Sequence, residues 1–477
     1  MQIPFTSADW QAIVPVSVVA VTALVVLIVD LLSPKAASPR YVSIGIGVAG
    51  AIAAGVLAAK QFGHDYGAFF GGFMTGGFTT VFEEIILIAL IGSLVLYGAI
   101  GAADRIAGVT TLMLWSTCGA MLMAGAANLM MIFLGLELLS LGLYCLCGLA
   151  DRRTARESAL KYLILSSTAS GFLLFGMGLL FGSSGSVLLA ALVNPTLAGN
   201  PLFIMGGCLF FIGLAFKLSL VPFHTWTPDV YEGAPLPVTA YMSVATKAAT
   251  IAVLARFIYA ALPSPVADRL LLPVWVIAAI SMIVGNVGML AQHDLKRLIA
   301  YSGIAQVGYI VAALAGTTPL GLRYAIFYLT AYAFMNLGAF AVAASLSTEA
   351  EQGTHLANYR ALGARRPFLA GAMTVFLLAM AGLPPTAGFL GKILILSTNV
   401  STGYVWLGAF LIVGTTISLY AYAKVIRLMY ERDEHRKTRD ARPFVPLAWA
   451  SAVVCGAAIF VMTFYPIAPS NILPLVK

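Results

Sequence analysis

The chain is built almost entirely from apolar segments that are long enough to cross a membrane, and this pattern restricts its fold more than any motif does. A membrane-spanning helix needs about 20 consecutive apolar residues. Charged residues make up only 10% of the chain and hydrophobic residues 60%, whereas roughly 25% of residues are charged in ordinary globular proteins. A water-soluble core cannot hide so much apolar surface. The sequence therefore predicts an all-α polytopic membrane protein.

Fourteen segments meet the length criterion, and the loops between them predict how they are oriented. They span roughly residues 10–32, 41–59, 77–101, 106–124, 128–149, 158–182, 202–222, 238–262, 272–291, 297–315, 320–346, 368–397, 403–430 and 446–466. Most basic loop residues follow odd-numbered segments, and the opposite side holds only Lys60, Arg269, Arg323 and Lys477. Because cytoplasmic loops carry the excess of Lys and Arg, we expect both termini on the outer side. The net charge of +8 reflects this sorting and not a nucleic-acid-binding surface.

The seventh and twelfth segments contain prolines that should break their helices. The seventh continues into LVPFHTWTPDVYEGAPLPV, and the twelfth contains AGLPPTAGFLGK. Proline removes a backbone donor and clashes with the preceding turn. Segments 4–8 and 9–13 each form a five-helix unit broken in its fourth helix, and an odd number of helices turns successive units upside down. We therefore predict two inverted repeats, a feature of transporters.

These repeats define the predicted domain organisation. An N-terminal three-helix segment covers 1–105, the first five-helix repeat 106–262 and the second repeat 263–430. A cytoplasmic basic loop and the last helix then cover 431–477.

Two ionisable side chains are predicted to lie deep in the hydrocarbon, and two more lie beside the predicted breaks, where residue counting does not fix their depth. Lys247 and Glu137 lie near the middle of their segments, and Lys217 and Lys392 lie beside the two breaks. A charge at the bilayer centre costs about 2.5–3.5 kcal/mol on insertion scales, so such a side chain needs a partner or a function. A structural ion pair between helices is one interpretation. A proton-carrying role is the other, and the coexistence of several such groups with broken helices favours it.

A lysine suits proton transport because burial favours its neutral form whereas a nearby carboxylate favours its charged form. We therefore expect Glu137 to pair with Lys217, as a modulator and a loadable proton site. Lys247 would accept the proton next, and Lys392 would serve the second unit. His224 is a candidate relay or a residue that holds the broken helix ends together. Water and Ser, Thr, Tyr or His groups must bridge the lysines, since apolar helices do not conduct protons.

The remaining charged and sulfur-containing residues receive structural interpretations. We expect Asp229 and Glu232 to bind backbone amides, and the sequence leaves Glu83 and Glu84 open. Four basic side chains near segment ends should extend to the interface: Lys161, Arg256, Lys424 and Arg427. The GIGVAG stretch (45–50) matches a dinucleotide-binding pattern, but it lies inside a segment, so close helix packing explains it. The five cysteines lack metal-ligand spacing, and we expect no cofactor in this chain.

The string FKLSLVPFHTWTPDVYEGAPLPVTAYMSVATKAA (216–249) resembles NADH-quinone oxidoreductase subunit N, an antiporter-like membrane subunit of bacterial respiratory complex I. FLGLELLSLGLYCL around Glu137, residues 159–180, HDLKRLIAYSGIAQVGYIVAAL (293–314) and AGLPPTAGFLGKILIL around Lys392 extend the resemblance over nearly the whole chain. The sibling subunits L and M differ after the shared PFHTW-x-PD core. Subunit M commonly has glutamate in place of Lys392.

The resemblance implies fourteen spans, two inverted repeats and proton translocation driven by quinone reduction elsewhere in the complex. In this family the positions matching Glu137, Lys217, Lys247 and Lys392 form the central proton path. NADH, flavin, iron–sulfur clusters and quinone would be bound by other subunits. The implied partners are subunit M and small membrane subunits beside it, in a bacterial inner (plasma) membrane. Many relatives have histidine where this chain has Gln306, which cannot take up a proton at ordinary pH.

Two alternatives stay open. A subunit of a multi-chain cation/proton antiporter would share this ancestry and architecture, and copurification with iron–sulfur, flavin and quinone-binding proteins would argue against it. Alternatively, the buried charges could lock helices together, in which case removing them would weaken assembly and not proton coupling.

Overall fold

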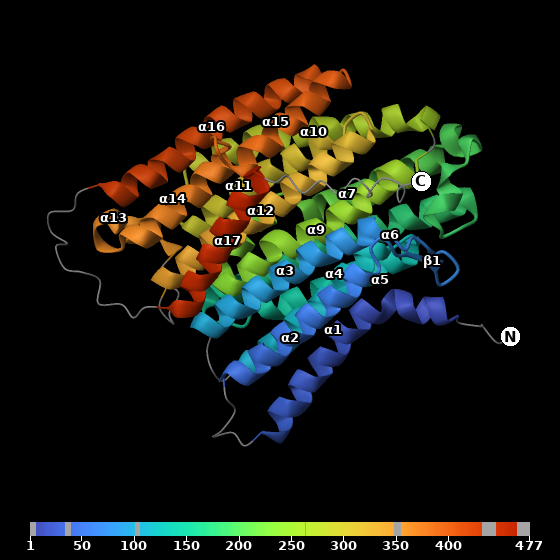
Figure 1. Cartoon of the computed structure of the whole chain (residues 1–477). Helices are drawn as coiled ribbons and strands as arrows, with labels where there is room; N and C mark the ends of the chain where they lie inside the picture. The colour runs from blue at the N-terminus through green and yellow to red at the C-terminus, as the bar shows by residue number, and fades with distance from the viewer. Residues whose placement is uncertain are drawn as a thin grey trace.

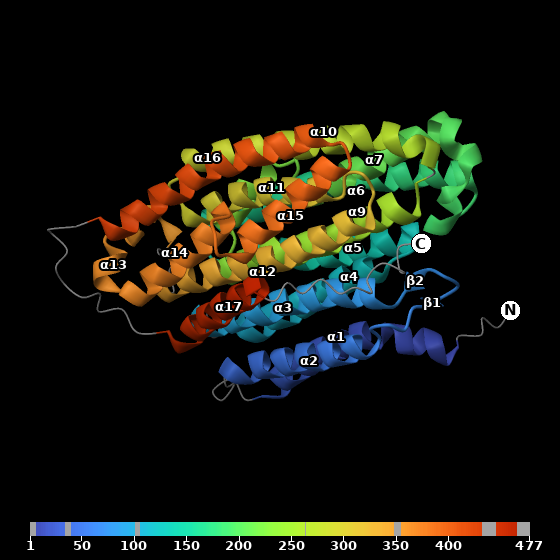
Figure 2. The same cartoon turned by 45° about the horizontal axis from the view of Figure 1, so that its top comes forward.

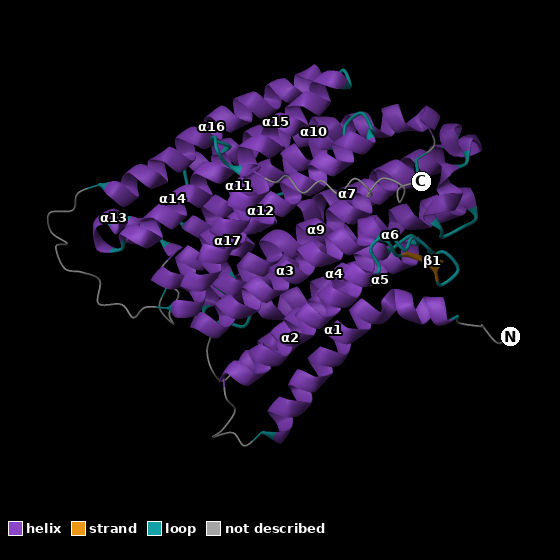
Figure 3. Cartoon of the chain, in the orientation of Figure 1, coloured by secondary structure: helices purple, strands orange, loops and turns teal. Residues whose placement is uncertain are grey.

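The computed structural model describes residues 6–33, 40–100, 105–262, 264–347, 354–431 and 445–464. These residues form a bundle of long helices with one short antiparallel hairpin between α2 and α3 (Figures 1 and 3). The elements are α1 (Ser7–Leu32), α2 (Arg40–Lys60), β1 (Gly67–Ala68), β2 (Phe73–Met74), α3 (Gly77–Ile100), α4 (Ile106–Gly125), α5 (Leu129–Cys147), α6 (Arg153–Ser184), η2 (Leu189–Val193), η3 (Pro195–Gly199), α7 (Pro201–Leu218), α8 (Trp226–Gly233), α9 (Leu236–Ala260), α10 (Ser264–Leu290), α11 (Leu295–Ala313), α12 (Pro319–Leu346), η5 (Leu356–Tyr359), α13 (Leu362–Arg365), α14 (Pro367–Ala381), α15 (Ala387–Ser401), α16 (Val405–Tyr430) and α17 (Pro446–Phe464).

Length and apolar composition identify the protein as a membrane protein. Twelve of the described helices are long and apolar enough to cross a membrane. The two other predicted segments, 297–315 and 368–397, coincide with α11 and with the shorter apolar helices α14 and α15. Large apolar side chains also stay exposed at the periphery, including Leu31 on α1 and Phe175 on α6. A hydrocarbon environment accounts for this exposure, and the predicted all-α membrane fold is confirmed.

Both predicted helix breaks are present. α7 ends at Leu218, because Ser219 adopts a left-handed conformation (φ 62°), and helical structure resumes only at Trp226. α14 ends at Ala381, where Gly382 has φ 81°, and α15 begins after Thr386, whose side chain accepts a hydrogen bond from the Phe389 amide. Each break therefore places a helix carboxyl end inside the bundle, with free carbonyl groups that need donors.

α9 is the central helix of the bundle, and its apolar window is completely buried. It packs against α3 and α4 on one side and against α7, α11 and α12 on others. α1 and α2 lie at one edge, and α10 and α16 pack together at the opposite edge (Figure 2). α17 packs along α12 and α3, so the last helix joins the second predicted repeat to the N-terminal segment. The terminal residues 1–5 and 465–477, and most of the predicted basic loop (432–444), lie outside the described residues.

The glycines of the GIGVAG stretch allow close packing of α2 on its neighbours. A Cβ atom at Gly50 would lie 2.2 Å from Thr22 Oγ1 on α1, and one at Gly47 would lie 2.8 Å from Thr110 Cγ2 on α4. A Cβ atom at Gly45 would meet nothing within 4 Å. The predicted packing role is therefore confirmed for Gly47 and Gly50.

We expect Gly50→Val to destabilise the protein by about 1–3 kcal/mol, because the added side chain forces α1 away from α2. Gly45→Val is the matched control on the same helix and should leave stability nearly unchanged. The midpoint of thermal unfolding in detergent measures both effects. Equal midpoints for the two variants would contradict the packing argument.

Candidate functional site

The three predicted lysines are all buried, and each comes from a different helix. Lys217 lies on α7, Lys247 on α9 and Lys392 on α15, and none is more than 4% exposed. A charge at such a position needs acceptors from the protein or from water. The partners of each lysine therefore define what the site can do.

Lys217 lies in the last turn of α7 and binds two hydroxyl groups of α6. Its Nζ donates to Tyr162 Oη and to Ser166 Oγ, at 3.0 Å each. The Nζ also lies 4.9 Å from the centre of the Tyr162 ring, which stacks on Trp226 of α8. The lysine is thus held by neutral groups beside the first helix break.

The predicted pair of Glu137 with Lys217 is not a direct contact. Glu137, on α5, accepts a hydrogen bond from Ser170 Oγ, and no ion pair joins it to Lys217 within the described ranges. Ser166 and Ser170 are one helical turn apart on the same face of α6, so the lysine and the carboxylate bind neighbouring positions on this helix without touching each other. The two groups still interact electrostatically. The predicted pair, with Glu137 as a modulator of Lys217, stays a prediction.

Lys247, in the middle of α9, has no hydrogen-bond partner for its Nζ among the described residues. The Nζ faces Tyr332 of α12, with the ring centre 6.0 Å away. A Cβ atom at Gly303 of α11 would lie 2.8 Å from the Nζ and 2.9 Å from Tyr332 Oη. The glycine therefore provides the space in which these two polar atoms lie.

Lys392 binds the carboxyl end of the helix that precedes the second break. Its Nζ donates to the carbonyl oxygens of Met380 and Ala381, at 3.0 Å each, and lies 4.8 Å from the Tyr309 ring centre. α14 has 15 residues and rises about 22 Å at 1.5 Å per residue. A continuous helix would have carried Lys392 beyond a hydrocarbon core of about 30 Å. The break instead leaves Lys392 buried beside the carboxyl end of α14.

Gln306 connects the surroundings of Lys392 to α12. Its Nε2 donates to the Met380 carbonyl at 3.1 Å, the same oxygen that Lys392 binds, and its Oε1 accepts a hydrogen bond from Tyr328 Oη. One turn earlier on α11, Ser302 and Tyr422 of α16 share a hydrogen bond. Polar groups thus follow α11 from the Lys247 niche toward Lys392.

Two polar rows went unnoticed in the sequence although their spacing is regular. Tyr162, Ser166 and Ser170 recur every fourth residue on α6, and the first two bind Lys217 while the third binds Glu137. Tyr328, Tyr332 and Asn336 recur in the same way on α12. Spacing of i, i+4 and i+8 puts side chains on one helix face, and this signal could have identified both rows.

His224 lies between α7 and α8 and is half-buried. Its Nδ1 has no hydrogen-bond partner in the described part of the chain. Other residues join the two helix halves: Trp226 Nε1 donates to the Phe216 carbonyl, and Thr227 Oγ1 donates to Ser219 Oγ. A relay role for His224 therefore stays a prediction.

One basic residue that was expected to reach the interface is buried. Arg256 is 5% exposed and donates to Thr79 Oγ1 and the Ala124 carbonyl, above the Phe78 ring. Lys296 is buried as well and donates to the Ala234 carbonyl after α8. The prediction for Arg256 is wrong because neighbouring helices cover its position. Counting residues to a segment end cannot reveal such cover.

Asp229 and Glu232 bind basic side chains and not the backbone amides that we expected. Asp229 pairs with Lys161 of α6 at 3.0 Å and with Arg297 of α11 at 2.7 Å, and Glu232 pairs with Arg297 at 2.8 Å. Burial acts to raise the pKa of Asp229, but hydrogen bonds from Lys161 and Arg297 outweigh it and hold the pKa below its ordinary value. The cluster ties α6, α8 and α11 together at one end of the bundle.

Glu83 and Glu84, which the sequence left open, lie on different faces of α3. Glu83 is buried, and its Oε2 has no partner among the described groups. Glu84 is half-buried and faces α2, where a Cβ atom at Gly55 would lie 3.2 Å from its Oε2. Neither carboxylate forms an ion pair within the described ranges, so neither is paired with Lys217, Lys247 or Lys392.

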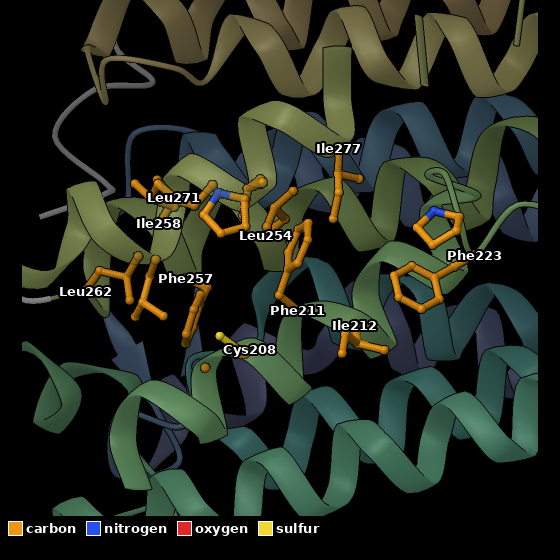
Figure 4. A pocket seen from close by; sticks show the side chains of 15 residues that line it. Cys208, Phe211, Ile212, Phe223, Leu254, Phe257, Ile258, Leu262, Leu271 and Ile277 are labelled. Atoms are coloured by element: carbon orange, nitrogen blue, oxygen red, sulfur yellow. The ribbon is translucent and has the colours of Figure 1, made fainter. Parts of the chain in front are cut away.

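A cavity of about 260 Å³ lies between α7, α9 and α10 but does not join the lysines. Figure 4 shows its apolar lining, which includes Phe211, Phe257 and the thiol of Cys208. No group of three or more His, Cys, Asp or Glu residues with metal-site geometry occurs in the described ranges.

Comparison with known proteins gives a consistent result. Residues 126–418 match the family described as NADH:quinone oxidoreductase/Mrp antiporter, TM. NADH-quinone oxidoreductase subunit N of Trichlorobacter lovleyi is 35% identical over 95% of this chain and 94% of its own length. Subunit N 1 of Symbiobacterium thermophilum is 38% identical over 93% of each chain. A chain of respiratory complex I from Thermus thermophilus superposes with a TM-score of 0.81 at 29% identity, covering 97% of this chain and 99% of that one.

The Asp229 cluster generates a prediction about pH. We expect Asp229→Asn to lower the free energy of unfolding at pH 7 by about 1 kcal/mol or less, as for a half-exposed ion-pair cluster. The midpoint of thermal unfolding falls accordingly. Because the folded state depresses this pKa, the stabilisation exists above the usual aspartate value of about 3.9 and is lost as the pH falls through the lower folded-state pKa. The difference between wild type and variant should therefore vanish in acid. Asp151→Asn, at a site whose side chain is 75% exposed, is the control. A difference that does not change with pH would contradict the assignment.

Proposed function

Because this chain belongs to the family of NADH-quinone oxidoreductase subunit N, we propose that it is a proton-translocating membrane subunit of a proton-pumping NADH:quinone oxidoreductase. Quinone reduction takes place elsewhere in such a complex, and this chain couples it to proton transfer along Glu137, Lys217, Lys247 and Lys392. The relatives named subunit N align over more than nine-tenths of both chains. This coverage favours the respiratory complex over a cation/proton antiporter, the other class that the family description names.

The observation that carries the proposal is the presence of two polar rows beside the broken helices. In the first predicted repeat, α6 is the third helix, and its row binds Lys217 and Glu137. In the second, α12 is the third helix, and its row begins at Tyr328, next to Gln306 and Lys392, and reaches Tyr332 beside Lys247. Equivalent helices thus provide equivalent polar faces, as two inverted repeats would.

Water completes the path where side chains do not touch. Lys247 Nζ, Tyr332 Oη, Tyr231 Oη and both polar atoms of Asn336 are buried without hydrogen-bond partners among the described residues. Buried polar groups are nearly always hydrogen-bonded to protein or to ordered water. Water molecules in this niche would satisfy these atoms and conduct protons past Gln306, which does not titrate. A relay through His224 is an additional branch beside the first break.

The proposal includes a membrane arrangement and a set of partner subunits. The chain crosses a bacterial inner membrane fourteen times, with α11 and the α14–α15 pair as two of the crossings and both termini outside. The repeats cover 106–262 and 263–430, between an N-terminal three-helix segment and the last helix. Subunit M and small membrane subunits are the neighbours. NADH, flavin, iron–sulfur clusters and quinone belong to other subunits of the proposed complex.

Replacing Lys247 tests the proposed path most directly. We expect Lys247→Met in the intact, reconstituted complex to abolish most proton translocation per electron, because the central proton acceptor is lost while the apolar volume remains. Lys60→Met, at the exposed end of α2, is the control and should pump normally. Proton uptake and quinone reduction are measured together in vesicles. Normal pumping by Lys247→Met, or a complex that fails to assemble, would support a structural role for this lysine instead.

Tyr332 tests the water-filled niche. Its hydroxyl lies beside the Asn336 side chain but makes no well-formed hydrogen bond among the described groups, so Tyr332→Phe should reduce stability little. We expect severalfold slower proton translocation with unchanged assembly. Tyr259→Phe, which removes a hydroxyl bound to the Thr318 carbonyl away from the lysines, is the control. Slower pumping in the control alone would contradict the placement of the path.

A further inference from the structure

A cavity of about 600 Å³ lies at the end of the bundle where α16 ends and α11 begins, and its lining does not include Lys217, Lys247 or Lys392. Its walls come from three places: the residues after α10, the start of η5, and the last turns of α16. Gln292 and His293 contribute from the first and His355 from the second. The Leu356 amide donates to the His293 carbonyl at 2.9 Å and fixes the two loops to each other. The cavity is thus bounded by defined backbone.

Positive charge exceeds negative charge around this cavity. Lys424 and Arg427, one turn apart on α16, are both exposed. Glu431 is the one carboxylate among the lining residues, and it is shared between Arg427 at 3.6 Å and Arg360 at 3.1 Å. Lys424 donates to the Leu290 carbonyl at 3.2 Å, which uses one of its three hydrogens. Donors remain for an anion that bears several oxygen atoms.

The exposed face of α16 changes character toward this cavity. Val413, Tyr420, Lys424 and Arg427 are spaced by seven, four and three residues, so they lie on one face of the helix. Val413 is 52% exposed and Tyr420 is 68% exposed, although both belong to a membrane-spanning helix. Toward the cavity, this face of α16 is therefore apolar at Val413, then aromatic at Tyr420, and then basic. This order matches hydrocarbon, interface and headgroup region in one membrane leaflet.

We propose that this cavity binds the headgroup of an anionic phospholipid whose acyl chains lie along the Val413–Tyr420 face of α16. The phosphate lies between Lys424 and Arg427, and the amide and imidazole groups of Gln292, His293 and His355 provide further donors. Glu431 opposes an anion, but Arg360 compensates its charge. A free anion would use the basic end alone. The continuous apolar and aromatic face is what selects a lipid.

Photo-crosslinking of the intact complex tests this site. The complex is embedded in phosphatidylcholine nanodiscs that contain phosphatidylglycerol with a photoreactive acyl chain, and labelling of α16 is quantified by mass spectrometry. Arg427→Gln should reduce this labelling about fivefold, since one basic residue near a membrane surface contributes about 1 kcal/mol toward anionic lipid. Arg427 is 83% exposed, so its replacement should not impair folding. Arg156→Gln, another exposed cation, on α6, should label like wild type.

Three outcomes would overturn the proposal. Equal labelling by a phosphatidylcholine probe would show that the site does not select anionic lipid. Full competition by inorganic phosphate would identify a free-anion site. Crosslinks from this face to a neighbouring protein, without lipid, would show that a subunit covers it. Reduced labelling in Tyr420→Ser, with no effect of phosphate, would support the lipid instead.

Discussion

Cations buried in a hydrocarbon-surrounded bundle need acceptors, and helix carboxyl ends provide several of them here. The last carbonyl groups of a helix lack partners and carry the negative end of its dipole. Four basic side chains donate to carbonyl groups at or just before such ends: Arg256 to Ala124, Lys296 to Ala234, Lys392 to Met380 and Ala381, and Lys424 to Leu290. A helix that breaks inside the bundle brings such an end to membrane depth. The prolines therefore create the helix end whose carbonyl groups Lys392 binds.

Lys217 and Lys247 depart from this pattern, and the departure distinguishes them functionally. Lys217 is held by two hydroxyl groups, and Lys247 has no protein acceptor among the described residues. An ammonium group with two carbonyl acceptors is stabilised in its charged form more than one without them. Lys392 is thus bound by protein carbonyl groups, whereas Lys247, on the completely buried α9, has only water as an acceptor under the proposed function.

The sequence predicted features that depend on one helix at a time. The apolar segments, the two breaks and the burial of Lys247 follow from length, proline chemistry and the cost of charge in hydrocarbon. The errors concern contacts between helices: Arg256 is covered by α3 and α4, and Asp229 binds basic side chains of α6 and α11. Which faces meet depends on tertiary packing, which periodicity within a segment does not encode. The rows on α6 and α12 were readable in advance, because their four-residue spacing needs no partner helix to be recognised.

The two predicted repeats differ in where their charged side chains lie. Lys217 precedes its break, whereas Lys392 follows its own. Lys424 comes 32 residues after Lys392, much as Lys247 comes 30 residues after Lys217, but Lys424 is exposed and binds a carbonyl group at the end of α10. The second helix of the first repeat carries Glu137, whereas the second helix of the other carries the neutral Gln306. Glu137 therefore lies near the lysine of the first repeat, whereas the corresponding position of the second repeat bears no charge. Because a negative charge favours a proton on a nearby lysine, the proposed function then implies that movement of charge near Glu137 changes the first repeat before the second.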